Sequence, residues 1–244
     1  MIDVRRKDTI YHKEGGWFSA SWHFSFDEYY DPENMGFGTL RVFNDDRLVP
    51  GAVWPMHPHR DIEGLTYVVE GTFKHADSLG NNGVLPAGSV QRMTLGSGAY
   101  HSEQNGSQTE PIRFIQMWIM PRERGLPPSV EQKVFTREDR TNFLLPVITP
   151  DGSSGVSVHQ DASVFVSRLD EGRSLGHEFA PGFGAYFFLI EGEAELNGEG
   201  LAAGDAARIR DEERLAVRAR QPSELIMVEV EVRRVSDQAL EGQA

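Results

Sequence analysis

The feature that most constrains the fold of this chain is one short pattern that occurs twice. Residues 67–73 read YVVEGTF, residues 188–194 read FLIEGEA, and a Pro/Ala-Ala-Gly turn follows each, at 86–88 and 202–204. An apolar run that ends in Glu-Gly is typical of a strand that leads into a tight turn. Because the pattern recurs in the same order in both halves, the sequence predicts a duplicated β-rich unit.

Short strand-like segments dominate the rest of the chain. The 25 glycines and 13 prolines separate segments rich in Val, Ile, Phe, Tyr and Thr, and no segment keeps a helical apolar period over three turns. Asn197-Gly198 and the run from Gly80 to Gly83 predict hairpin turns. The predicted fold class is all-β, with two barrels. The strands predicted most clearly lie at 65–69, 72–75, 113–120, 185–190 and 225–232.

The proline-rich segment 121–128 is the predicted linker between the two copies. It divides the chain into an N-terminal domain at 1–130, a C-terminal domain at 131–234 and a tail at 235–244.

The composition narrows the classes of partner and site. A formal charge of −13 gives no attraction for nucleic acid or anionic lipid, and no apolar run is long enough for a signal peptide or a membrane span. We therefore expect a cytoplasmic protein that binds neither nucleic acid nor membranes, and a monomer rather than an obligate oligomer. The chain has 0 cysteines, so any metal must be bound by histidine and carboxylate.

Three of the eight histidines lie in two short segments that suit one site. On an extended chain, side chains two residues apart face the same way, so His57 and His59 project together, as do His101 and Glu103. Two such pairs on neighbouring strands can converge. Three imidazoles and one carboxylate suit Fe(II), Mn, Co, Ni, Cu or Zn and leave coordination positions open for a substrate or dioxygen.

The spacing of these residues resembles the two motifs that define cupins. The first is Gly51-x5-His57-x-His59-x3-Glu63-x7-Gly71, with one extra residue before the last glycine, and the second is Gly98-x2-His101-x3-Asn105, with glycine at 96 in place of proline. The segments HPHRDIEGLTYVVEG, HADSLGN, GSGAYHSEQN, HFSFDEYYDPENMGFGTLRVFNDD and QMWIMP further resemble the pirin family, and most closely its bacterial quercetin 2,3-dioxygenases.

The resemblance implies a bicupin with two jelly-roll-like barrels, each a double-stranded β-helix, and one divalent metal in the N-terminal barrel. Its ligands would be the residues that match His57, His59, His101 and Glu103, and Fe(II) is the first choice of ion, with Cu, Ni, Co, Mn and Zn as alternatives. The C-terminal barrel is expected to be degenerate. Alignment of Gly192 on Gly71 places Glu178, Ala180 and Gly184 at the positions of His57, His59 and Glu63.

Glu63 competes with Glu103 for two roles. General cupins use a glutamate at the position of Glu63 as a ligand, side-chain parity does not decide between the two, and the pirin likeness favours Glu103. Glu63 could then orient a histidine. Glu103 could serve as both ligand and base, or Glu63 could be the base, so both residues are candidate catalytic groups. Aromatic and apolar residues near the motifs are predicted to line a slot for a flat substrate. These are Phe24, Phe26, Phe43, Trp54, Met93 and Trp118.

Two functions follow from the resemblance. The first is a metal-dependent dioxygenase that opens the heterocycle of flavonols such as quercetin and releases carbon monoxide, with an enolic aromatic substrate and dioxygen as ligands. The second is a redox-sensing regulatory protein that binds a protein partner without catalysis. No serine-hydrolase elbow or phosphate-binding loop is present to suggest other chemistry.

Overall fold

The computed structural model describes residues 1–153 and 155–232, and nearly all of their regular structure is β. The helical elements in these ranges are two short 3-10 turns, η1 (Lys7–Thr9) and η2 (Glu138–Arg140). The predicted all-β class is confirmed. No helix within the described ranges is long and apolar enough to cross a membrane.

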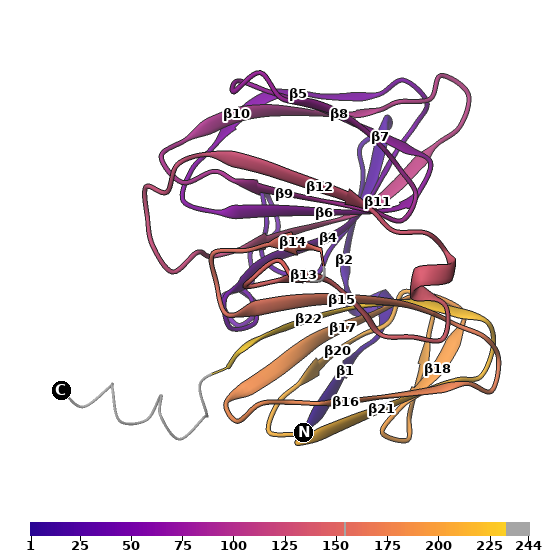
Figure 1. Ribbon diagram of the computed structural model, residues 1–244. Helices are drawn as coiled ribbons and strands as arrows, with labels where there is room; N and C mark the ends of the chain where they lie inside the picture. The colour runs from indigo at the N-terminus through magenta and orange to yellow at the C-terminus, as the bar shows by residue number, and fades with distance from the viewer. Residues whose placement is uncertain (154, 233–244) are drawn as a thin grey trace.

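The first half of the molecule is a sandwich of a large and a small antiparallel sheet, drawn in indigo to magenta in Figure 1. Its large sheet has the order β12 (Ser129–Val134), β9 (Ser89–Thr94), β6 (Glu63–Glu70), β11 (Ile112–Ile119), β4 (Leu40–Leu48), β3 (Phe18–Trp22), β2 (Tyr11–Glu14). Its small sheet has the order β5 (Val53–His59), β10 (Ala99–Asn105), β7 (Thr72–Asp77), β8 (Asn82–Pro86).

The second half repeats this arrangement. Its large sheet has the order β1 (Ile2–Arg5), β20 (Ala206–Ile209), β17 (Phe183–Glu191), β22 (Ser223–Glu231), β15 (Ala162–Leu169), β13 (Leu145–Thr149), β14 (Val156–Ser157). Its small sheet has the order β16 (Ser174–Glu178), β21 (Arg214–Ala219), β18 (Glu193–Leu196), β19 (Glu199–Ala202). The duplication predicted from the sequence is therefore visible as two similar sandwiches.

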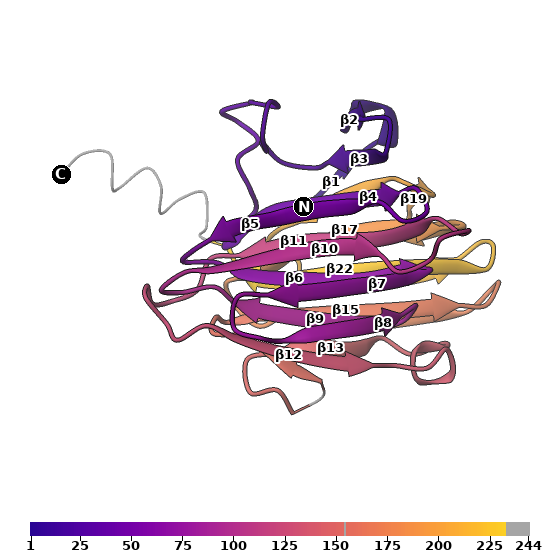
Figure 2. The ribbon, with the colours of Figure 1, turned by 90° about the horizontal axis from the view of Figure 1, so that it is seen from above.

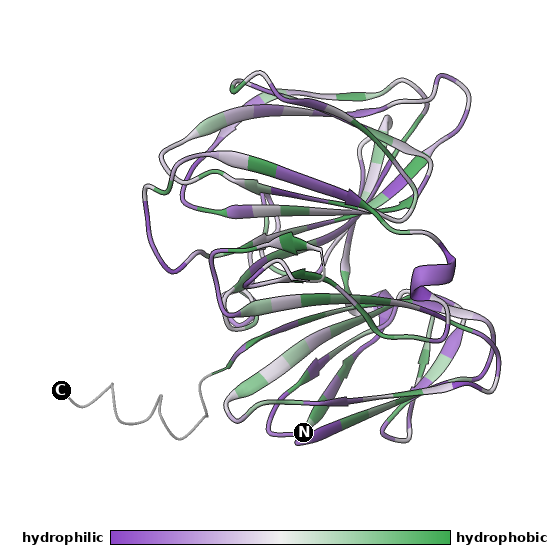
Figure 3. Ribbon diagram, in the orientation of Figure 1, coloured by the Kyte–Doolittle hydropathy of each residue, from purple (hydrophilic) through white to green (hydrophobic). Residues whose placement is uncertain are grey.

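The two large sheets pack against each other, and the two small sheets lie on the outside (Figure 1). Seen from above, the strands of the stacked sheets run in nearly the same direction (Figure 2), as is usual for aligned packing. The main core lies between the large sheets, where Phe43 and Tyr67 of the first half meet Tyr186 and Phe188 of the second. Apolar residues recur along these central strands in Figure 3.

The chain crosses twice between the halves. The first strand, β1, pairs with β20 in the second half, and the next strand, β2, belongs to the first half. The chain stays in the first half through β12, which pairs with β9, and crosses again before β13. The coil at 121–128 is therefore followed by a strand that still belongs to the first half. The division of the chain near residue 130 stays a prediction, and the tail at 235–244 lies outside the described residues.

The five predicted strands are all present and differ from the observed ones by a few residues at their ends. They correspond to β6, β7, β11, β17 and β22. The hairpin at Asn197-Gly198 is also confirmed, because it joins β18 to β19 with positive φ at both residues. The glycines of the repeated Glu-Gly pattern are equivalent in conformation, since φ is +79° at Gly71 and +84° at Gly192.

Replacement of Gly192 by alanine is expected to lower the free energy of unfolding by about 2–3 kcal/mol, because it adds overpacking to left-handed backbone strain. A Cβ atom at Gly192 would lie 2.3 Å from the Pro222 carbonyl oxygen. Gly198→Ala is the matched control, since Gly198 has φ +92° but nothing within 4 Å of its Cβ position. Urea denaturation would measure both variants, and equal losses would contradict the role assigned to crowding.

Candidate metal centre

The three histidines of the two motifs converge on neighbouring strands of the small sheet. His57 and His59 lie on β5, and His101 lies on β10 directly opposite His57. The ring centroids are 4.5 Å apart for His57 and His101 and 5.1 Å apart for His59 and His101. One ligand nitrogen from each ring can be chosen so that all three lie within 4.8 Å of one another. Alternation on β5 and the antiparallel register thus place all three imidazoles at one point.

The electrostatics of His59 and His101 favour neutral imidazole, the form that binds metal ions. Burial, reinforced by the neighbouring imidazoles, lowers the pKa of His101 to about 2. Burial, reinforced by His57, lowers the pKa of His59 to about 4. The Nδ1 of His57 lies 2.7 Å from the Pro55 carbonyl oxygen. Because that oxygen can only accept, Nδ1 carries the proton and Nε2 keeps a free lone pair.

His101 gives the clearest evidence that these residues fit a metal ion. Its side chain is buried, yet neither ring nitrogen has a hydrogen-bond partner in the described structure. Buried polar atoms are usually satisfied, so an unpartnered imidazole beside two others is accounted for by a bound cation. The donor set fits a divalent transition metal.

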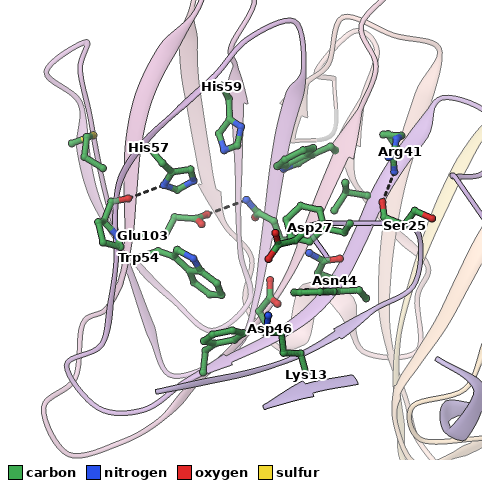
Figure 4. Close-up of a pocket in the computed structure, with 18 residues that line it drawn as sticks. Lys13, Ser25, Asp27, Arg41, Asn44, Asp46, Trp54, His57, His59 and Glu103 are labelled. Atoms are coloured by element: carbon green, nitrogen blue, oxygen red, sulfur yellow. Dashed lines mark hydrogen bonds between the residues drawn. The ribbon is translucent and has the colours of Figure 1, made fainter. Parts of the chain in front are cut away.

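Glu103 is buried on the same wall of the cavity as His57 (Figure 4). Its Oε1 accepts a 3.0 Å hydrogen bond from Gln116 Nε2, and the Thr66 hydroxyl donates to Gln116 Oε1 at 2.7 Å. The threonine therefore fixes the orientation of the glutamine amide. Within the described residues, no hydrogen bond is made to Glu103 Oε2. Burial raises the pKa of Glu103 to about 7, against the opposing hydrogen bond from Gln116.

Glu63 is not brought to the histidines. Its carboxylate accepts a hydrogen bond from the Thr94 hydroxyl at 3.1 Å and one from His159 Nδ1 at 3.0 Å, on the side of the sheet that faces the second half. The alternation that places His57 and His59 on one face does not extend to Glu63, because the chain turns at Asp61, where φ is +55°. The strands on either side of this turn, β5 and β6, belong to different sheets.

A cavity of about 810 Å³ opens beside His57, His59 and Glu103. Of the aromatic residues predicted to line it, Phe26, Trp54 and Trp118 do so, and Phe18 and Trp22 were not foreseen. The other three predicted residues are elsewhere. Phe24 and Phe43 pack on Tyr186 between the two large sheets, with ring centroids 4.9 Å and 5.2 Å away, and Met93 packs with Ile62, Leu95 and Ala99.

The cavity also has a polar wall that the sequence analysis did not identify. Asn44, Asp46 and Gln116 line it and are all buried. Burial, with added repulsion from Glu103 and Asp45, raises the pKa of Asp46 well above its usual range. The sequence does show that Val42, Asn44 and Asp46 alternate along one strand, and this pattern could have predicted that Asn44 and Asp46 share a face.

Comparisons with known proteins agree with this geometry. The Pirin family profile matches residues 4–119, and the profile for the quercetinase C-terminal cupin domain matches residues 146–230. The chain is 39% identical to the quercetin 2,3-dioxygenase of Escherichia coli K12 over 94% of its length and 99% of the relative. It is 38% identical to a pirin-like protein of Caulobacter vibrioides, again over 94% of the chain and 99% of the relative.

Solved structures give the same result. The crystal structure of the Escherichia coli pirin YhhW in complex with nickel(II) superposes with a TM-score of 0.90 and 36% identity, covering 96% of this chain and 100% of that one. That complex and the histidine cluster described above indicate one metal site in the first half. The two family profiles and the near full-length relatives show that the chain belongs to the pirin family, with a bicupin fold.

Proposed function

We propose that this chain is a metal-dependent dioxygenase that opens the heterocycle of flavonols such as quercetin. The observation that carries the proposal is the position of three clustered imidazoles at one end of a cavity with aromatic walls. Such a cavity suits a flat aromatic ligand. The name of the Escherichia coli relative, quercetin 2,3-dioxygenase, supports this reaction.

We propose that His57, His59, His101 and Glu103 hold a single divalent ion, with Fe(II) as the native one. When bound, the ion would supply Lewis acidity that favours the deprotonated form of a substrate hydroxyl. Nickel(II) is the ion named for the Escherichia coli structure, and elemental analysis of the purified protein would distinguish iron from nickel.

The residues of the chain would bind the flavonol and receive its proton. Trp54 and Trp118 would hold the flat ring system on the apolar walls. Glu103 would take the proton of the 3-hydroxyl, and its hydrogen bond from Gln116 would hold the carboxyl group in place as it does so. Glu63 does not line the cavity, which leaves Glu103 as the proposed base. Both atoms of dioxygen would enter the product, and carbon 3 would leave as carbon monoxide.

Metal-replete protein is expected to consume quercetin only in the presence of dioxygen and to release one carbon monoxide per quercetin. Quercetin absorbance and released carbon monoxide would be measured together, with metal content determined on the same sample. Free metal ion at the same concentration is the control for autoxidation. If the loaded protein releases no carbon monoxide, the dioxygenase proposal fails and regulatory binding of a protein partner becomes the stronger alternative.

A further inference from the structure

The cavity has a second functional wall opposite the histidines. The side chains of Val42, Asn44 and Asp46 alternate along β4 in the large sheet and line the cavity, whereas His57 and His59 lie on the small sheet. Figure 4 shows Asn44 and Asp46 at one end of the cavity and the two histidines at the other. A ligand with one edge at the histidines would bring its other end toward Asn44 and Asp46.

One oxygen atom of each of these two side chains is left without a hydrogen bond in the described structure. Asn44 is 3% exposed and Asp46 is 4% exposed, and the Oδ1 atom of each has no hydrogen-bond partner within the described chain. The cations that line the cavity are engaged elsewhere, since Lys13 pairs with Glu28 and Arg41 donates to the Ser25 carbonyl oxygen. Such buried groups are costly in the free protein, so a ligand that hydrogen-bonds to them is favoured.

The adjacent carboxylate shows how this chain satisfies a structural acid. Asp45 is next in sequence to Asp46 but faces the other side of the sheet, where Arg113 donates to both of its oxygens at 2.8 Å. Within residues 1–153 and 155–232, no arginine pairs with Asp46 in this way. Asp46 therefore keeps the capacity to bond a ligand.

We propose that Asn44 and Asp46 bind a hydroxyl group on the part of the substrate that points away from the histidines, so that the enzyme selects polyhydroxylated flavonols. A hydroxyl both donates and accepts hydrogen bonds, which suits a carboxyl and an amide side by side. An anionic group would instead be repelled by the carboxylate of Asp27, which also lines the cavity. This inference rests on the proposed function, because it takes a flavonol as the ligand.

The test compares quercetin with 3-hydroxyflavone, which keeps the metal-binding edge but lacks every other hydroxyl. Dissociation constants would be measured without dioxygen by quenching of tryptophan fluorescence in metal-loaded protein, and kcat/KM would be measured in air. Wild type is expected to prefer quercetin. Asp46→Leu is expected to reduce this preference by at least about tenfold, because a site built to bind a hydroxyl discriminates strongly against its absence.

Asp46→Asn is the matched control, since it has the same shape and retains donor and acceptor atoms. It is expected to keep most of the preference, and thermal unfolding midpoints would show that both variants fold. Asn44→Leu provides a second variant that should act in the same direction. Equal affinity of wild type for the two flavonols, or equal effects of Asp46→Leu on both, would overturn this inference. Binding that discriminates without carbon monoxide release would sink only the proposed reaction.

Discussion

Replacement of His101 by alanine is expected to abolish metal binding and turnover together. His101 faces His57 across the β5–β10 pair, and both of its nitrogens lack a partner in the described protein. Loss of a group that merely orients a ligand costs about 10–100-fold in metal affinity, so loss of a ligand should cost more. Metal analysis after dialysis against a weak chelator should therefore find wild type loaded and the variant empty.

His12→Ala provides the control for this experiment. His12 is an exposed histidine on β2 that bonds Ser21 and Glu14, away from the cluster. The control should keep both the metal and the rate. If His101→Ala retains a stoichiometric ion at wild-type affinity, the metal lies elsewhere and the proposed ligand set is incorrect. A normal unfolding midpoint for His101→Ala would show that the fold has survived the substitution.

The histidine cluster could be predicted because strand alternation places His57 with His59, and the resemblance to the two cupin motifs brings in His101. Alternation on one strand is enough to place His57 beside His59, and the second motif lies on the neighbouring strand in antiparallel register. The Glu-Gly repeat was local, because the positive φ at Gly71 and Gly192 is required by the chain reversal that follows each strand.

The features that could not be predicted depend on how distant segments pack. Phe24 and Phe43 are aromatic like Trp54, but the second half covers them through Tyr186. Glu63 shares its sequence parity with His57, yet the turn at Asp61 sends it into the other sheet. No one-dimensional pattern encodes which sheet a strand joins, so pocket residues are less predictable than ligands that belong to two recognisable motifs.

The second half has the same architecture as the first but lacks the three clustered histidines. Its interior is filled by apolar side chains such as Phe187, Leu189 and Val217. Gly184 has no room for a side chain, because a Cβ there would lie 2.3 Å from the Ile209 carbonyl oxygen. Glu178 is exposed and pairs with Arg214 at 3.1 Å. Among residues 1–153 and 155–232, the three histidines of the first half are the group that could hold a metal ion. The second half contributes packing to the first.

Replacement of Glu224 by alanine should reveal how tightly the two halves are joined, with an expected loss of about 3–5 kcal/mol in the free energy of unfolding. Glu224 is 1% exposed and accepts hydrogen bonds from the Tyr67 hydroxyl at 2.6 Å and from Arg168 at 2.5 Å, and it also pairs with Arg140. Tyr67 belongs to the first half and the other three residues to the second. Truncation would leave the buried Arg140 without its counterion.

Glu191 offers a matched control because it pairs with the same Arg168, at 3.6 Å, from a position that is 41% exposed. Glu191→Ala should cost less than about 1 kcal/mol, since solvent screens an exposed pair. Glu224→Gln should fall between the two, because the amide keeps a hydrogen-bond acceptor for Tyr67 but removes the charge. Urea denaturation followed by fluorescence and circular dichroism would measure all three variants. A loss for Glu224→Ala no larger than that for Glu191→Ala would mean that apolar packing between the large sheets, rather than this network, holds the halves together.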